Sequence, residues 1–315
     1  MLQKLMEKKI DFSQPLMVLA PLAGYTDLPF RSVVKKFGAD ITISEMISSN
    51  ALVYKSEKTL KMIEKSPSED PYIVQIAGNK PELVRDAVLI LNEIDGIDGI
   101  DLNCGCPAPK VFNHGSGSNL LGDLKKLEEI LSTVKKYNKK QYTTAKVRLG
   151  VNEKIPVEIG KAVEACGVDF VSVHGRTRAG KYKAPVDYDA IKLMKESIKI
   201  PVIANGDIKD YAKAKEVLEY TKANGVMIGR GAIGKPWVFY QLKHGVEDIS
   251  EEIKKEIILE HYDAVIRFHG EHGAVMFRKL LHSYSKGYRG ANEFRDVVNR
   301  VSDIHIMRDL IESFF

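Results

Sequence analysis

Residues 101–111, DLNCGCPAPKV, place two cysteines one residue apart and follow the second with a proline. Cys104 and Cys106 admit three interpretations: part of a metal site, simple packing, or a reactive thiol. A zinc site needs four ligands, typically with Cys-x-x-Cys spacing. That spacing is absent among the candidate ligands Cys104, Cys106, His114 and Cys166. We therefore expect no metal here, and we predict Cys106, on a loop stiffened by Pro107, as the reactive thiol. A thiol is ordinarily protonated at neutral pH, which suits a proton donor.

Other polar residues follow β-rich apolar runs at the point where each run ends. They are Gln75, Asn103, Lys146, Arg148, His174, Arg176, Arg178, Asn205, Gly206, Asp207, Gly229, Arg230 and Gly231. The last two of these segments, ANGDI and GRGAIG, favour a phosphate site with Arg230 as its cationic neighbour. The alternative is that their glycines only turn the chain. GRGAIG also fits the GxGxxG pattern of a Rossmann unit, but it closes the series of runs where such a motif would open it.

The chain contains eight such apolar runs, each followed by a segment with helical spacing. The runs are residues 16–24, 41–49, 72–78, 99–105, 142–150, 170–176, 201–208 and 225–233. This alternation predicts an α/β protein, a (β/α)8 TIM barrel with parallel strands. Its second helix must lie within residues 55–65. After Trp237 only helical periodicity remains, which predicts a smaller C-terminal all-α domain. We place the barrel at residues 1–240 and the helical domain at 241–315.

Composition narrows the classes of protein. Of the 315 residues, 44% are hydrophobic and 28% are charged, which excludes wholesale disorder, and the net charge of +5 is compatible with an anionic partner. No signal peptide and no apolar run of the roughly 18 residues needed for a membrane span is found. Three cysteines make no disulfide framework. We therefore expect a cytoplasmic protein without a membrane segment, and a monomer.

Eight segments in order resemble one family. They are APLAGYTDLPFR, SEMISSN, VQIAG, DLNCGCPAPKV, GSGSNLL, VHGRTR, PVIANGDI and GRGAIGKPWVF. Over residues 16–239 the chain is similar to the tRNA-dihydrouridine synthases, most closely to the bacterial B-type members. The resemblance implies an FMN-containing barrel that reduces uridines of tRNA to dihydrouridine with NADPH.

The family's residues carry over onto matching positions of this sequence. The resemblance makes Cys106 the proton donor and Cys104 a packing residue. It implies these flavin contacts: Pro21, Leu22, Ala23, Gln75, Lys146, His174, Asn205, Gly206, Asp207, Gly229 and Arg230. Because the C4 carbonyl polarises the C5=C6 bond of uracil, hydride should reach C6 and a proton C5, from two separate donors. A fixed ammonium at Lys146 would favour reduced flavin; alternatively that side chain only reaches for solvent.

Substrate contacts are expected at the barrel mouth and in the helical domain. Asn103 either binds the uracil edge or caps its own loop. Arg176 and Arg178 would supply one side of a basic surface for tRNA. The other side would come from residues 277–300, with Arg278, Lys279 and Tyr284 as contacts and tyrosines as stacking faces. The alternative for this stretch is an ordinary solvated helix face.

The basic stretch also departs from the B-type pattern. It has Leu280 where that pattern has histidine and Ser283 where it has tryptophan, which leaves the uridine position open. Two other functions stay open as well. One is an FMN barrel acting on a free pyrimidine, like dihydroorotate dehydrogenase, which would need no helical domain. The other is a non-catalytic tRNA-binding protein.

Overall fold

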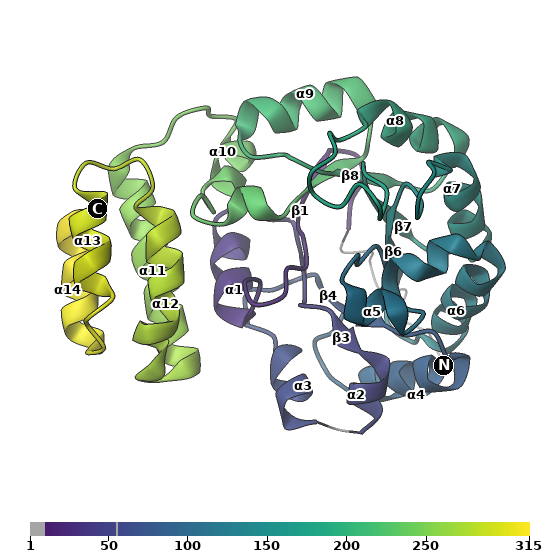
Figure 1. The fold of residues 1–315 in the computed structure, drawn as a ribbon, viewed down its shortest axis with the longest axis horizontal. Coiled ribbons are helices and arrows are strands. Elements are labelled where there is room, and N and C mark those ends of the chain that lie inside the picture. The colour runs from purple at the N-terminus through teal and green to yellow at the C-terminus, as the bar shows by residue number, and fades with distance from the viewer. Residues whose placement is uncertain (1–9, 55) are drawn as a thin grey trace, which may run out of the picture.

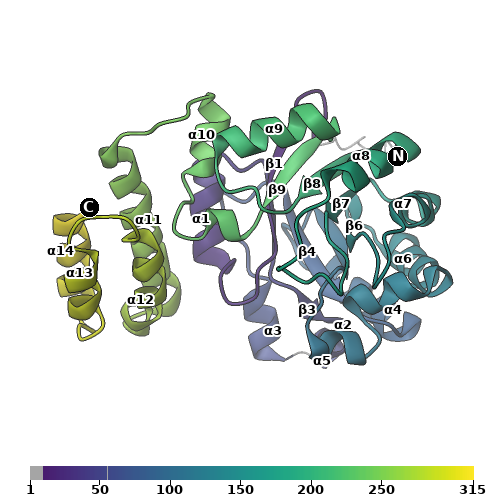
Figure 2. The same ribbon diagram turned by 45° about the horizontal axis from the view of Figure 1, so that its top comes forward.

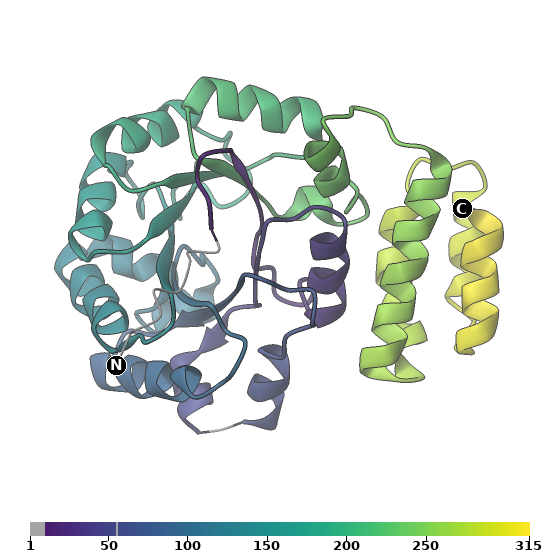
Figure 3. The ribbon, with the colours of Figure 1, turned by 180° about the vertical axis from the view of Figure 1, so that it is seen from behind.

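The computed structural model describes residues 10–54 and 56–315 and contains a closed parallel barrel (Figures 1 and 3). The sheet order is β2-β1-β9-β8-β7-β6-β5-β4-β3, and β2 also pairs with β4, which closes the ring. The strands are β1 (Leu16–Leu19), β2 (Ile41–Ile43), β3 (Ile47–Ser48), β4 (Tyr72–Ala77), β5 (Gly99–Cys104), β6 (Tyr142–Arg148), β7 (Phe170–His174), β8 (Val202–Asn205) and β9 (Gly225–Ile228). β2 and β3 both come from the second predicted run and both pair with β4. The eight predicted runs thus form the eight strand positions of a TIM barrel, as expected, with β2 and β3 sharing the second position.

Helices alternate with the strands, and most of them cover the outer face of the barrel. They are α1 (Leu28–Lys36), α2 (Ser49–Val53), α3 (Glu57–Met62), α4 (Pro81–Asn92), α5 (Pro109–Asn113), α6 (Leu124–Tyr137), α7 (Pro156–Ala165), α8 (Tyr188–Ser197) and α9 (Tyr211–Thr221). Aspartate side chains cap α1, α6, α8 and α9 by accepting a backbone N–H of the first turn. The second unit has two short helices, and α3 lies inside the predicted window of residues 55–65.

The two ends of the barrel interior differ in polarity. Apolar side chains from most of the strands fill the N-terminal end, where the ring of Phe12 meets Phe170 edge to face with centroids 5.8 Å apart. The C-terminal end carries the polar residues that follow the strands. Because the apolar plug closes one end, ligands can enter the barrel only from the other.

The C-terminal part of the chain is helical, as predicted. A 3₁₀ turn at Gly117–Gly122 precedes α6 in the barrel, and a second one at Arg230–Ala232 follows β9. Then come α10 (Val238–His244), α11 (Glu251–His269), α12 (His272–Tyr284), α13 (Ala291–Val298) and α14 (Ile304–Phe314). In Figure 2 the last four helices stand beside α1, and α11 packs along α1. They have a hydrophobic core of their own, which includes Trp237. The domain division at residue 240 stays a prediction, and α10 spans it.

Candidate active site

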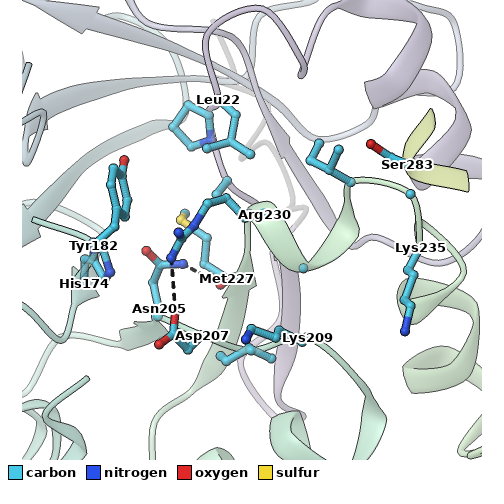
Figure 4. Close-up of a pocket in the computed structure, with 18 of the residues that line it drawn as sticks. Leu22, His174, Tyr182, Asn205, Asp207, Lys209, Met227, Arg230, Lys235 and Ser283 are labelled. Carbon is cyan, nitrogen blue, oxygen red and sulfur yellow. Dashed lines mark hydrogen bonds and ion pairs between the residues drawn. The ribbon is translucent and has the colours of Figure 1, made fainter. Parts of the chain in front are cut away.

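A cavity of about 1410 Å³ opens at the C-terminal ends of the strands and extends to the helices α11 and α12 (Figure 4). Thirteen of the predicted catalytic, cofactor and substrate residues of the barrel line it. They are Pro21, Leu22, Ala23, Gln75, Asn103, Cys106, Lys146, His174, Asn205, Gly206, Asp207, Gly229 and Arg230. Parallel strands bring their carboxyl ends to one edge, so residues separated by 200 positions in the chain meet here.

Cys106 lies on a loop that is held from three sides. Its backbone N–H donates to Asn103 Oδ1 at 2.9 Å, and its carbonyl accepts from Ser118 Oγ at 2.8 Å. The preceding carbonyl, of Gly105, accepts from Arg148 Nε at 2.7 Å. The thiol is partly exposed to the cavity, whereas Cys104 is fully buried and burial raises its pKa. Cys106 is therefore a positioned, accessible thiol, and Cys104 packs in the core as expected.

A chain of buried hydrogen bonds supports this loop from below. Asn103 Nδ2 donates to Gln75 Oε1 at 2.8 Å, and Gln75 Nε2 donates to Asp101 Oδ2 at 2.7 Å. Thr144 Oγ1 donates to the other oxygen of Asp101 at 2.6 Å, while burial raises the pKa of that carboxyl to about 6. Asn103 thus caps its own loop with one end and binds Gln75 with the other. The loop-cap alternative describes this arrangement, and a contact of Asn103 with substrate stays a prediction.

Lys146 places an ammonium group in the cavity. Its Nζ donates to Asn205 Oδ1 at 3.1 Å, and Asn205 is oriented by donating to the carbonyl of Met227 at 2.7 Å. Burial, together with the charge of Arg148, lowers the pKa of Lys146 to about 8. His174 is 7% exposed, and burial and the neighbouring cations hold its pKa well below its usual range. At neutral pH the site therefore combines a cationic lysine that favours an anion with a neutral imidazole.

The loop after β8 and the loop after β9 form a tight cradle. Gly206 has a φ of +133°, and a Cβ there would lie within 3.1 Å of Val186 and His174. Gly231 approaches the backbone of the loop after β8 so closely that a Cβ on Gly231 would lie 2.1 Å from the carbonyl oxygen of Ile208. Arg230 Nη2 donates to Asp207 Oδ1 at 3.1 Å, a contact drawn in Figure 4. This part of the cavity offers backbone amides and a guanidinium to an anionic group.

Two of the predicted RNA contacts are buried and paired within the protein. Arg176 is 4% exposed; it donates to the carboxylate of Asp207 and to the carbonyl of Ala184. Tyr284 lines the cavity but is 1% exposed, and its hydroxyl pairs with His261 Nδ1 at 2.8 Å. A local sequence pattern does not show which distant partners cover a side chain, and the contact of these two residues with tRNA stays a prediction.

The other three predicted contacts are also engaged with protein groups. The guanidinium of Arg178 lies 3.8 Å from the ring centroid of Phe112. Arg278 Nη2 donates to the carbonyl of Val301 at 2.9 Å, and Lys279 donates to the carbonyl of Gly24. None of these three lines the cavity. Their contact with tRNA stays a prediction.

Sequence reasoning missed several residues that line the cavity. Tyr182 stands next to His174 in Figure 4, with the guanidinium of Arg230 4.4 Å from its ring centroid. Five further cations line the cavity from both parts of the chain; we call them the rim cations: Lys209, Lys235, Lys254, Lys286 and Arg289. The last two belong to the basic stretch of residues 277–300, which the sequence indicates. Lys209 and Lys235 stand singly in the sequence, and Lys254 lies in a helix that begins with acidic residues, so no local signal marks these three.

Among the described residues, no group of three or more His, Cys, Asp or Glu side chains is arranged to hold a metal ion. Within that same part of the chain, no helix has both the length and the apolar character needed to cross a bilayer.

Comparison with solved structures finds other barrels. An old yellow enzyme homologue from Zymomonas mobilis aligns with a TM-score of 0.54 at 12% identity, covering 75% of this chain and 91% of that one. A 2-naphthoyl-CoA reductase aligns with a TM-score of 0.57 at 13% identity, covering 73% and 50%. At such identities the likeness shows the fold alone.

Comparison of sequences is more specific. A relative from Helicobacter pylori strain J99, named probable tRNA-dihydrouridine synthase, is 53% identical over 308 residues, which is 97% of this chain and 94% of the relative. The tRNA-dihydrouridine synthase B of Vibrio parahaemolyticus is 40% identical over 309 residues, covering 95% of each chain. The family model described as dihydrouridine synthase matches residues 18–313. With that match and these relatives, the chain belongs to the dihydrouridine synthase family.

Proposed function

We propose that this protein reduces the C5=C6 bond of specific uridines in tRNA, with FMN as its flavin and NADPH as reductant. The observation that carries the proposal is one cavity in which a member of this family gathers a positioned thiol, a partly buried ammonium and a glycine cradle. These three features match the three demands of the reaction: a proton donor, a stabilised reduced cofactor and a place for a phosphate.

The cavity residues fit FMN on three observations. A volume of about 1410 Å³ accommodates a flavin with a base beside it. The pKa of Lys146 is lowered to about 8, and its ammonium donates to one side-chain acceptor, Asn205. Because an ammonium can donate three hydrogen bonds, the anionic edge of a flavin ring would be a further acceptor for it. Gly206, Gly231 and Arg230 suit the phosphate. When bound and reduced, FMN supplies the hydride that C6 of uracil receives.

The protein's own residues account for the remaining steps. Asn103, Ser118 and Arg148 hold the loop of Cys106, so that its thiol keeps one position and gives its proton to C5 of the uracil. Lys146 keeps a positive charge beside the cofactor. A uridine must leave its stack in folded RNA before it can enter such a cavity, and the rim cations offer contacts for the phosphates on either side of it.

The proposal is tested on one purified preparation. The visible spectrum reports flavin, and incubation with NADPH and tRNA lacking dihydrouridine, followed by mass spectrometry, maps the product. A flavoprotein that forms dihydrouridine is expected. Turnover of dihydroorotate without RNA would instead favour a free pyrimidine substrate, and RNA binding without a flavin would favour a non-catalytic protein. The cytoplasmic location and monomeric state stay predictions.

Cys106→Ala tests the role of the thiol. Because general acid catalysis typically contributes about 10²- to 10⁴-fold, we expect a loss of that size in dihydrouridine formation, with NADPH still reducing the flavin. The matched control is Cys166→Ala, since Cys166 is a thiol that lies outside the cavity. Wild-type product formation by Cys106→Ala would show that the proton comes from another group.

A further inference from the structure

The loop between β1 and α1 has two faces with different neighbours. One face lines the cavity with Ala20, Pro21, Leu22 and Ala23. Leu22 reaches the loop after β9. A Cβ added at Gly229 in that loop would lie 3.6 Å from the Cδ1 of Leu22. The position of Leu22 and Ala23 therefore shapes the wall against which the cofactor would lie.

The opposite face of the same loop is held by the C-terminal helices. Lys279 of α12 donates to the carbonyl of Gly24, and its Nζ lies 4.9 Å from the ring centroid of Tyr25. His269, at the end of α11, pairs through Nε2 with Asp27 Oδ2 at 3.3 Å. Two separate helices thus contact the segment Gly24–Asp27, which directly follows the cavity-lining residues.

Gly24 is held on both sides of its peptide. Its N–H donates to the carboxylate of Glu45, which is 8% exposed, while its carbonyl accepts from Lys279. The residue has a φ of +76°, a conformation that glycine adopts freely. A glycine without these two contacts could leave that conformation at little cost. The barrel and the C-terminal helices each supply one of the contacts that fix it.

Displacement at Gly24 would be transmitted to the cavity. Leu22 N–H donates to Thr26 Oγ1 at 2.8 Å, and the Leu22 carbonyl accepts from the N–H groups of Tyr25 and Thr26, both at 3.0 Å. These bonds tie the cavity-lining half of the loop to the half that the helices hold, so the loop moves as one turn.

We propose that Lys279, together with His269, is a positioning residue for the cofactor: it acts through Gly24 to hold the Leu22–Ala23 wall of the flavin site. This role is distinct from the RNA contact expected of Lys279, and it rests on the proposed function in so far as FMN is the cofactor. The C-terminal helices would then complete the cofactor site of the barrel, independently of RNA.

The test compares Lys279→Ala with Lys279→Arg, which keeps a donor, and with Lys36→Ala. Lys36 is the matched control because it also joins α1 to α11, through Glu260 at 3.0 Å, yet it does not touch this loop. The measurements are the Kd for FMN without RNA and the hydrogen exchange of residues 20–27 in the FMN-free protein. For one lost hydrogen bond we expect Lys279→Ala to raise the Kd about 2- to 10-fold and to speed exchange similarly. Lys279→Arg and Lys36→Ala should resemble the wild type.

Two outcomes would overturn the inference. One is wild-type FMN affinity and exchange in Lys279→Ala with weakened tRNA binding, which would make Lys279 an RNA contact. The other is an equal effect of Lys36→Ala, which would point to general loosening of the interface. If the wild type binds no FMN, the proposed function fails, while the exchange measurement still decides whether Lys279 holds the loop. His269→Ala gives a second, independent variant with the same expected direction.

Discussion

Two cations in this molecule, the fully buried Arg31 and the partly buried Lys146, differ in how well the fold satisfies them. Arg31 of the helix α1 and Glu69 are both fully buried. Arg31 Nε donates to Glu69 Oε1 at 2.7 Å, and the other two nitrogens of Arg31 donate to the carbonyls of Thr26 and Glu64. In the barrel mouth, Lys146 has one side-chain acceptor, Asn205, and burial lowers its pKa. The fold thus satisfies the guanidinium of Arg31 with hydrogen bonds. The ammonium of Lys146 can still donate to a ligand, and its burial lowers the stability of the folded protein.

Breaking the buried ion pair between Arg31 and Glu69 should have the largest effect on stability. Arg31→Met leaves Glu69 buried with only Thr42 and the backbone of Ser66 as donors. An uncompensated buried charge typically costs about 3–5 kcal/mol, so we expect the free energy of unfolding in urea to fall by about that amount. The double variant Arg31→Met with Glu69→Leu removes both charges and should recover most of the loss. A loss below about 1 kcal/mol in the single variant would show that the pair is not what holds this region.

Removing the charge of Lys146 should raise the free energy of unfolding, whereas removing that of Arg31 lowers it. The pKa of Lys146 falls from 10.5 to about 8 in the folded chain, so its burial opposes folding most strongly below about pH 8, and the penalty fades as pH rises toward 10.5. Lys146→Met should therefore stabilise the FMN-free protein by about 1–3 kcal/mol at pH 7 and by much less at pH 10.

The same variant should weaken binding of reduced flavin, because the ammonium is lost. Thermal unfolding at the two pH values and titration with FMN measure the two effects. A destabilised Lys146→Met protein at pH 7 would contradict the comparison, since it would place Lys146 among the charges that hold the fold.

The smallest effect on the fold is expected at the cavity rim. Lys286 is exposed, so Lys286→Ala should change stability by no more than about 0.5 kcal/mol. If it contacts a phosphate, the variant should weaken tRNA binding and reduce the slope of log affinity against log salt by about 1. Lys139→Ala, at the opposite end of the barrel before β6, is the matched control. Equal slopes in both variants would remove Lys286 from the RNA surface.

The sequence predicted the barrel well because buried parallel strands leave a strong local signal, and the strand-end rule then gathered Cys106, Lys146 and Asn205 in one cavity. It did not show which side chains are covered by a partner that is distant in the sequence. Arg176 is covered by pairing with Asp207, and Tyr284 with His261, at separations of 31 and 23 residues. Charge and aromaticity look alike in sequence whether a side chain meets solvent or a partner, so exposure had to come from the structure.

The helix α1 belongs to two hydrophobic cores. Phe30 and Val34 lie in the core of the barrel, while Val33 and Phe37 lie in the core of the C-terminal helices. A chain cut near residue 240 would leave Val33 and Phe37 facing water, on a helix that the barrel cannot do without. We therefore expect the two parts to melt in a single cooperative transition, and a barrel separated from the C-terminal helices to lose stability.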